Sequence, residues 1–201
     1  MLSTHETQQS KKYCKNCSTN NCYVLSIACV LAALARTIHF MLRIGLGHDT
    51  HRLIDGSFIL LGGVQIEHTK SLLGHSDADV LLHAITDALL GAAGLGDIGE
   101  LFPDTDPANR NRNSAEILQI AWDQVRQNHW QIVNLDIVLF AEKPKLAPHK
   151  GAIRQRIAEL LEIDVTQVGI KAKTGEGIGI IGREDAISAE CVVLLQSADP
   201  V

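Results

Sequence analysis

The order of strand-like and helix-like apolar patterns along residues 42–195 is the feature that most restricts the fold of this chain. The order is not the strict strand–helix alternation of a doubly wound parallel sheet. We therefore predict an α+β fold, with a mixed sheet of four to five strands and helices packed on one face. The expected elements are strands at 42–46 and 58–66, helices at 77–95 and 114–128, a strand at 133–139, a helix after Pro148, and strands at 168–172 and 186–195.

Composition divides the chain near Met41. Residues 1–40 carry four basic residues and one acidic residue, whereas residues 41–201 carry 14 basic and 22 acidic residues. The overall net charge of −5 argues against a general nucleic-acid binder, which needs a basic face, so we expect no nucleic-acid partner. We predict one folded domain at 41–201, preceded by an appendage at 1–40.

The appendage has three interpretations. Its apolar run at 23–35 is 13 residues long, whereas a membrane span takes about 20, so we expect no membrane partner. The favoured interpretation of residues 1–40 is a disordered appendage or an upstream extension. The second is a targeting segment, because 33–35 resembles a signal-peptidase site. A metal site comes third, because the cysteine spacing fits no zinc template. The cysteines concerned are Cys14, Cys17, Cys22 and Cys29.

The fifth cysteine, Cys191, alternates with apolar residues in the last expected strand. This pattern predicts a core thiol. Because the body of the chain has no disulfide framework, we expect a reducing compartment.

A candidate metal site combines Asp49 and His51 with His83. In an extended segment, side chains two residues apart project to the same side, so Asp49 and His51 can share an ion. Two histidines and one carboxylate make up the ligand set of a catalytic zinc. Asp79 and Asp87 lie four residues to either side of His83. Either could accept a hydrogen bond from the histidine ring nitrogen that does not face the metal. The alternative is that Asp49 caps a turn and both histidines are scaffold residues.

Residues 74–77 lie at the start of the first expected helix and offer a second candidate site. Free amides at a helix N-terminus suit a phosphate, and His75 and Ser76 add polar groups. The alternative is simple capping of the helix by Ser76.

The glycine-rich segment 173–183 contains a literal G-x-G-x-x-G, but it is followed by a strand pattern rather than a helix, which excludes a dinucleotide-binding fingerprint. A phosphate-gripping loop remains, in which Lys173, Thr174 and Arg183 bind the anion and Glu176 is available for a hard cation. A glycine-rich hairpin with exposed charges is the alternative.

Taken together, these motifs resemble the 2-C-methyl-D-erythritol 2,4-cyclodiphosphate synthase family of the non-mevalonate isoprenoid pathway. The resemblance covers essentially all of 41–201 and none of 1–40. The matching stretches are Arg43-Ile44-Gly45, Asp49-x-His51, His75-Ser76-Asp77-x-Asp79 with His83, 86–92, Gly96-Asp97-Ile98-Gly99, 102–106, Pro144-Lys145, Lys171-Ala172, Thr174-x-Glu176 and Gly182-Arg183.

The resemblance implies a homotrimer with active sites between adjacent subunits, and a small-molecule cytidine diphosphate substrate. The implied reaction is the metal-dependent cyclisation of 4-diphosphocytidyl-2-C-methyl-D-erythritol 2-phosphate with release of CMP. It also implies Zn²⁺, or another divalent metal, at Asp49, His51 and His83, and Mg²⁺ or Mn²⁺ at the substrate diphosphate near Glu176.

His75 and Thr174 match positions implied to act in catalysis. Ile180 stands where the family commonly has a phenylalanine beside a channel along the trimer axis, so the ligand of that channel is left open. The implied contacts to the methylerythritol half are Ser76, Asp97, Ile98, Gly99, Phe102, Pro103, Asp104, Thr105 and Asp106. The implied contacts to the cytidine half, which come from the neighbouring subunit, are Ala141, Glu142, Lys143, Pro144, Lys145, Leu146, Lys173 and Thr174. The remaining substrate contacts are Gly175, Ile180 and Arg183.

Two other functions remain open from the residues alone. A zinc-dependent phosphohydrolase would use the same ligands with a metal-bound water, and a non-catalytic trimeric protein would bind metal without turnover. For location we expect a bacterial cytoplasm, with a plastid as the alternative, and residues 1–40 leave targeting open.

Overall fold

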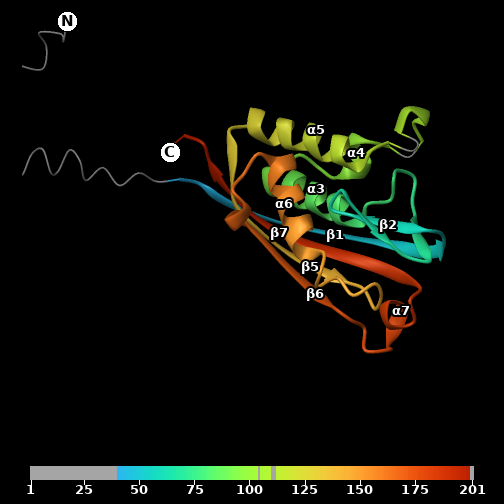
Figure 1. Ribbon diagram of the computed structural model, residues 1–201. Coiled ribbons are helices and arrows are strands. Elements are labelled where there is room, and N and C mark those ends of the chain that lie inside the picture. Colours follow the sequence, from blue (N-terminus) through green and yellow to red (C-terminus); the bar gives the residue numbers. More distant parts are fainter. Residues whose placement is uncertain (1–39, 104, 110–111, 200–201) are drawn as a thin grey trace, which may run out of the picture. The chain divides into compact units, whose positions relative to one another are not determined.

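Two long antiparallel strands form the centre of the sheet. The computed structural model describes residues 40–103, 105–109 and 112–199 (Figure 1). β1 (Leu42–Asp55) pairs with β7 (Ala186–Ser197) along most of its length. The other strands are β2 (Phe58–Leu61), β3 (Val64–Glu67), β4 (Lys70–Leu73), β5 (Trp130–Phe140) and β6 (Val168–Lys173).

The main sheet has five strands in the order β4-β1-β7-β5-β6. β5 and β6 are parallel, and the other neighbouring pairs are antiparallel, so the sheet is mixed. Figure 1 shows α3, α5 and α6 on the same side of this sheet. The predicted α+β fold with helices on one face is therefore confirmed. The helices are α3 (Val80–Ala93), α4 (Ile98–Leu101), α5 (Ser114–Gln127), α6 (Lys150–Leu161) and α7 (Gly179–Gly182), with 3₁₀ turns at Pro107–Asn109 and Val165–Gln167.

Three strand predictions need correction. The strand expected at 42–46 continues to Asp55, because pairing with β7 carries it through the polar residues after Gly47 as far as Arg52, and β4 pairs with its last residues, Arg52 to Asp55. The single strand expected at 58–66 is a hairpin of β2 and β3, in which Gly62 and Gly63 make the turn with φ of 64° and 73°. Two consecutive glycines of positive φ are a strong hairpin signal that the apolar pattern concealed. β4 was not predicted.

The expected start of the first helix, and its capping by Ser76, also need correction. Helix α3 begins at Val80 rather than near Asp77, and its N-cap is Asp79 rather than Ser76. The Asp79 carboxylate accepts hydrogen bonds from the amides of Leu81 and Leu82 at 3.2 and 3.1 Å. Helix α5 begins at Ser114, as expected, and its N-cap is Asn113.

The core lies between α3 and the sheet. Eleven of the 14 residues of α3 are buried, including Leu81, Leu82, Ile85 and Leu89. Cys191 on β7 is fully buried, and burial raises the pKa of its thiol to about 12, which confirms the predicted core thiol.

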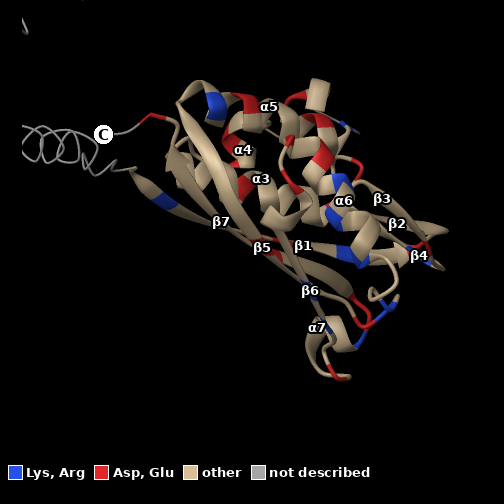
Figure 2. Ribbon diagram, turned by 60° about the vertical axis from the view of Figure 1, so that its left-hand side comes forward, with Lys and Arg blue, Asp and Glu red and all other residues tan. Residues whose placement is uncertain are grey.

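The opposite face of the sheet carries exposed apolar side chains. Leu42, Ile44 and Leu46 alternate along β1 and are 58, 72 and 67% exposed, and Val192 on β7 is 44% exposed. Figure 2 shows that charged residues are frequent on the helices and loops, while the long strands are mostly uncharged.

Residues 1–40 were predicted to be an appendage, and all of them except Phe40 lie outside the described residues. None of the helices in the described ranges combines the length and apolarity that a membrane crossing needs.

Candidate metal centre

Three side chains from two elements meet at one point above the sheet. Asp49 and His51 project from the same face of β1, and His83 comes from the first turns of α3. Asp49 Oδ2 lies 2.9 Å from His51 Nε2 and 2.9 Å from His83 Nδ1, and these two nitrogens are 3.1 Å apart. The side chains are 26, 15 and 12% exposed, respectively. The predicted ligands are thus brought together as a triangle of ligand atoms.

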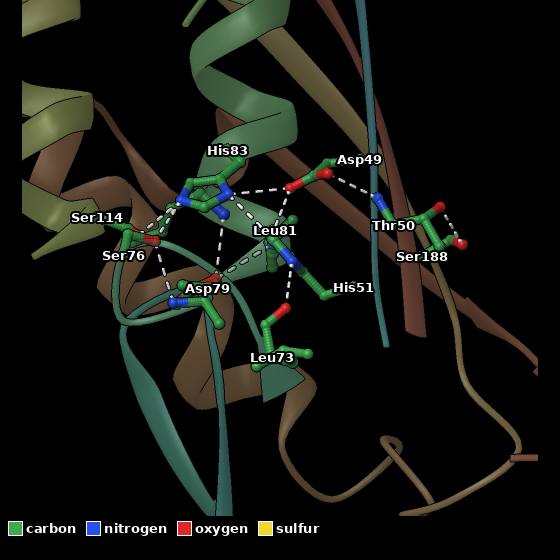
Figure 3. Close-up of polar contacts among 12 residues, drawn as sticks. Asp49, Thr50, His51, Leu73, Ser76, Asp79, Leu81, His83, Ser114 and Ser188 are labelled. Atoms are coloured by element: carbon green, nitrogen blue, oxygen red, sulfur yellow. Dashed lines mark hydrogen bonds and ion pairs between the residues drawn. The ribbon is translucent and has the colours of Figure 1, made fainter. Parts of the chain in front are cut away.

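The far side of each histidine ring is held by another group. His51 Nδ1 lies 2.9 Å from the carbonyl oxygen of Leu73 on β4, which can only accept, so this nitrogen carries the hydrogen. His83 Nε2 lies 2.9 Å from Ser114 Oγ and 3.0 Å from Ser76 Oγ (Figure 3). Both rings therefore turn their remaining nitrogen toward Asp49.

The charges at this point favour an ionised carboxylate. Burial by itself would raise the pKa of Asp49, but hydrogen bonds from His51 and His83 outweigh burial and hold that pKa well below its usual range. Burial likewise would lower the pKa of His51, but the hydrogen bond and charge of Asp49 raise it. When His51 loses a proton from Nε2, Nδ1–H keeps its bond to Leu73, and an Nε2 lone pair faces Asp49 Oδ2.

The geometry and chemistry of these atoms fit a divalent metal. Zn²⁺ binds histidine nitrogen at about 2.0–2.1 Å, which in a tetrahedral site separates neighbouring ligand atoms by about 3.3 Å. The edges of the Asp49–His51–His83 triangle, at 2.9–3.1 Å, are close to this value. Two imidazoles and one carboxylate leave a fourth position for a further ligand.

A cavity of about 230 Å³ opens beside the three ligands. It brings together most of the residues predicted around the metal and the methylerythritol half, and adds Asn109 and Ile117, which the sequence analysis missed. Asn109 lies in a 3₁₀ turn and Ile117 on α5, and neither carries a local signal for such a site. The lining residues are Asp49, His51, His75, Ser76, His83, Asp87, Ile98, Gly99, Phe102, Asn109 and Ile117.

The remaining residues predicted for the methylerythritol half lie on the following loop. The Asp97 carboxylate caps α4 through the amide of Glu100 at 2.8 Å, and that of Asp106 accepts from the amide of Ala108 at 2.9 Å. Pro103 and Thr105 belong to the same loop, and Asp104 lies outside the described residues.

The residues predicted for the cytidine half form a separate cluster. Thr174 Oγ1 donates to Glu176, and the amide of Gly175 donates to Glu142 Oε2 at 3.0 Å. Lys143 pairs with Glu184 at 2.8 Å. None of the predicted residues at 141–146 or 173–176 is among the described residues that line the metal-side cavity. Within one chain the two groups of predicted site residues are therefore not brought together.

Ile180 lines a second cavity, of about 590 Å³, beside Thr50, Arg52 and Lys70. Arg183 Nε donates to Asp185 at 3.0 Å.

The prediction that Asp79 or Asp87 holds a histidine ring is wrong for Asp79. Its carboxylate is fully buried and accepts hydrogen bonds from the amides of Gly62 and Gly63 as well as from the start of α3, because it joins the β2–β3 turn to the helix. Asp87 lines the cavity, and its Oδ1 accepts from the amide of Ile98 at 2.8 Å. The groups behind the rings are instead Leu73, Ser76 and Ser114.

Comparison with known proteins decides the family. The model of the YgbB family matches residues 42–196. The chain belongs to the YgbB family. A curated relative from Shouchella clausii, named 2-C-methyl-D-erythritol 2,4-cyclodiphosphate synthase, is 54% identical over 159 residues, covering 79% of this chain and all of the relative.

Solved structures of YgbB-type proteins have the same fold. A 2-C-methyl-D-erythritol 2,4-cyclodiphosphate synthase solved in a CDP-bound form is 40% identical, with a TM-score of 0.71, over 76% of this chain and 99% of that one. The bifunctional IspDF of Campylobacter jejuni is 45% identical, with a TM-score of 0.77, over 80% of this chain. This chain spans 43% of that bifunctional protein. The resemblance found in the sequence is confirmed.

Proposed function

We propose that this chain converts 4-diphosphocytidyl-2-C-methyl-D-erythritol 2-phosphate into 2-C-methyl-D-erythritol 2,4-cyclodiphosphate and CMP, a step in isoprenoid precursor synthesis. The observation that carries the proposal is the Asp49–His51–His83 triangle beside a 230 Å³ cavity, in a chain of the YgbB family. The reaction is a lyase reaction, in which the substrate's 2-phosphate oxygen bonds to the β-phosphorus while the bond from that phosphorus to the CMP oxygen breaks.

This reaction needs no strong base from the protein. A phosphate monoester already carries a charge of about −1.5 to −2 near neutral pH, so the attacking oxygen is available without deprotonation by the protein. The difficulty is to bring one anion onto another. Asp49, His51 and His83 would hold Zn²⁺, and Glu176 a second ion, Mg²⁺ or Mn²⁺, at the diphosphate. Such ions neutralise phosphoryl charge when they are bound.

The chain's own side chains would hold the two ends of the substrate. Ile98, Gly99 and Phe102 provide the part of the cavity wall that suits the methylerythritol half, and His75 and Ser76 offer polar groups to its phosphate. The segment 141–146, with Lys173, Thr174 and Gly175, would hold the cytidine half, and Arg183 would add a positive charge. Fixing both ends of one flexible molecule turns the attack into a well-oriented intramolecular step.

We further propose that the enzyme is a homotrimer with each site shared by two subunits. Two observations support this arrangement. The apolar residues Leu42, Ile44 and Leu46 are exposed on the sheet face opposite the helices. The metal-side cavity and the 141–146 cluster are also separate within one chain, so a neighbouring subunit is needed to complete the site. We place the enzyme in a bacterial cytoplasm, with residues 1–40 outside the catalytic domain.

The proposal is tested by phosphorus NMR on the full chain with 4-diphosphocytidyl-2-C-methyl-D-erythritol 2-phosphate. We expect CMP and a cyclic diphosphate to appear together, and to stop when a chelator removes divalent metal. His83→Ala should abolish zinc binding and cyclisation. His129→Ala is the matched control, because that side chain is 77% exposed and lies on the turn between α5 and β5, and it should leave both unchanged.

Free phosphate without a cyclic product would establish a phosphohydrolase instead. Zinc binding without any turnover would establish a non-catalytic metal-binding protein.

A further inference from the structure

Ser114 contacts the side of His83 that faces away from the other two ligands. Its Oγ lies 2.9 Å from His83 Nε2, whereas Nδ1 of the same ring faces Asp49 (Figure 3). Ser114 is fully buried at the start of α5, so no solvent competes for this contact. Ser114 does not cap α5, because Asn113 supplies that cap.

Asp77 decides which way the hydrogen bond between Ser114 and His83 runs. Ser114 Oγ donates to Asp77 Oδ1, and the Ser114 amide donates to Asp77 Oδ2 at 3.1 Å. A serine hydroxyl has one hydrogen, and the carboxylate uses it, so Ser114 Oγ is left to accept from His83 Nε2–H. Because Nε2 carries this hydrogen, Nδ1 is the nitrogen of His83 that can offer a lone pair to a metal bound between Asp49 and His51.

Ser76 contacts the same nitrogen at 3.0 Å but is held differently. Its Oγ accepts from the amide of Ala78 at 3.0 Å and lies 3.3 Å from Ser114 Oγ, and Ser76 lines the cavity. Of the two hydroxyls, Ser114 is the one with a bond to a carboxylate. The Asp77 amide in turn donates to the carbonyl of Arg112 at 3.2 Å, which ties the segment before α3 to the segment before α5.

We propose that Ser114, held by Asp77, is a positioning residue that sets the orientation and tautomer of His83 for metal binding. The inference rests on the proposed metal centre and adds the group that aims one of its ligands. Partners behind a ligating histidine typically change metal affinity by about 10- to 100-fold when they are removed. Packing between α3 and α5 would then control metal affinity, because Ser114 and His83 lie on these two helices.

The test measures Zn²⁺ affinity of the full chain by competition with a chromophoric chelator. We expect Ser114→Ala to weaken Zn²⁺ binding by about 10-fold or more, and Ser114→Thr, which keeps the hydroxyl, to restore most of it. Asn113→Ala is the matched control, because it removes the cap at the same helix end without touching His83. It should lower the melting temperature of the metal-free protein and leave Zn²⁺ affinity within about twofold of wild type.

Co²⁺ absorption spectra provide a second measurement, since a reoriented ligand should change the visible bands of Ser114→Ala but not those of Asn113→Ala. Equal Zn²⁺ affinity in Ser114→Ala and wild type overturns the inference, and so does an equal loss in Asn113→Ala. A larger loss in Ser76→Ala than in Ser114→Ala also overturns it.

Failure of the proposed function is recognised separately. A wild-type chain that binds Zn²⁺ but releases no CMP contradicts the proposed reaction, while the affinity difference still supports Ser114. A wild-type chain that releases CMP with unchanged affinity in Ser114→Ala contradicts this inference alone. A wild-type chain that binds no Zn²⁺ overturns the inference, and CMP release then tests the reaction.

Discussion

At the scale of single residues, Asp79 connects two parts of the fold that lie apart in sequence. Its two carboxylate oxygens accept from the amides of Gly62 and Gly63 in the β2–β3 turn and of Leu81 and Leu82 in α3. Burial raises the pKa of this carboxyl group, while the same amide hydrogen bonds oppose the rise. The free-energy cost of burying this carboxyl group is therefore offset by its hydrogen bonds.

Asp79→Ala should lower the free energy of unfolding by about 3–5 kcal/mol, because it removes a helix cap and leaves buried amides unpaired. Urea unfolding of the metal-free protein measures this change. Asn113→Ala, which removes the single cap bond of α5, should cost only about 1 kcal/mol. Equal losses in the two variants would contradict the role of Asp79 in holding the hairpin turn.

At the scale of elements, the position of α3 on β1 depends on two glycines. A Cβ at Gly45 would lie 1.9 Å from the carbonyl oxygen of Ala88, and one at Gly47 would lie 1.9 Å from that of Ala84. Both obstacles are helix backbone, which cannot move aside as a flexible side chain would. The close approach also sets the distance between Asp49 on β1 and His83 on α3.

Gly47→Ala should therefore push α3 away from the sheet. We expect a loss of about 3 kcal/mol or more in unfolding free energy and a weaker Zn²⁺ affinity, measured by urea unfolding and chelator competition. Gly91→Ala is the matched control on the same helix, because a Cβ there meets nothing within 4 Å. It should raise stability by up to about 1 kcal/mol. A tolerated Gly47→Ala would show that the helix can shift without loss.

At the scale of the whole molecule, the exposed apolar sheet face is the surface on which the proposed trimer depends. Ile44 and Leu46 are 72 and 67% exposed on this face. The proposed metal ligands all come from one chain, whereas the proposed nucleotide contacts come from its neighbour. Assembly and metal binding can therefore be separated by experiment.

Leu46→Glu should convert a trimer into monomers, because it places a charge in an apolar interface. We expect Zn²⁺ binding to persist and CMP release to fall by at least about 100-fold, since the nucleotide half of the site is lost. Analytical ultracentrifugation and phosphorus NMR measure these two effects. Ala152→Glu, the same kind of change at an exposed position of α6, should alter neither. A monomeric variant with full activity would contradict a site shared between subunits.

Much of the fold follows from local pattern, and the errors have physical causes. The positions of α5, β5, α6, β6 and β7 agree with the predicted periodicities within a few residues. The β2–β3 turn was missed because Gly62 and Gly63 sit inside a continuous apolar run, which conceals a reversal of the chain. Ser76 was considered as the cap of α3, whereas Asp79 caps it, because capping preference alone does not distinguish two suitable residues three positions apart.

The sequence by itself predicted the mixed α+β class, the three candidate metal ligands and the family, because periodicity, residue chemistry and collinear motifs are local properties. Tertiary structure decided which groups contact the histidine nitrogens that face away from Asp49. Ser114 follows His83 by 31 residues and Leu73 follows His51 by 22, so only packing brings each carbonyl or hydroxyl to its ring. Only the tertiary structure showed that the cavity and the 141–146 cluster are separate within one chain. That separation depends on the positions of β1 and β5 in the sheet and of α3 in the helix layer.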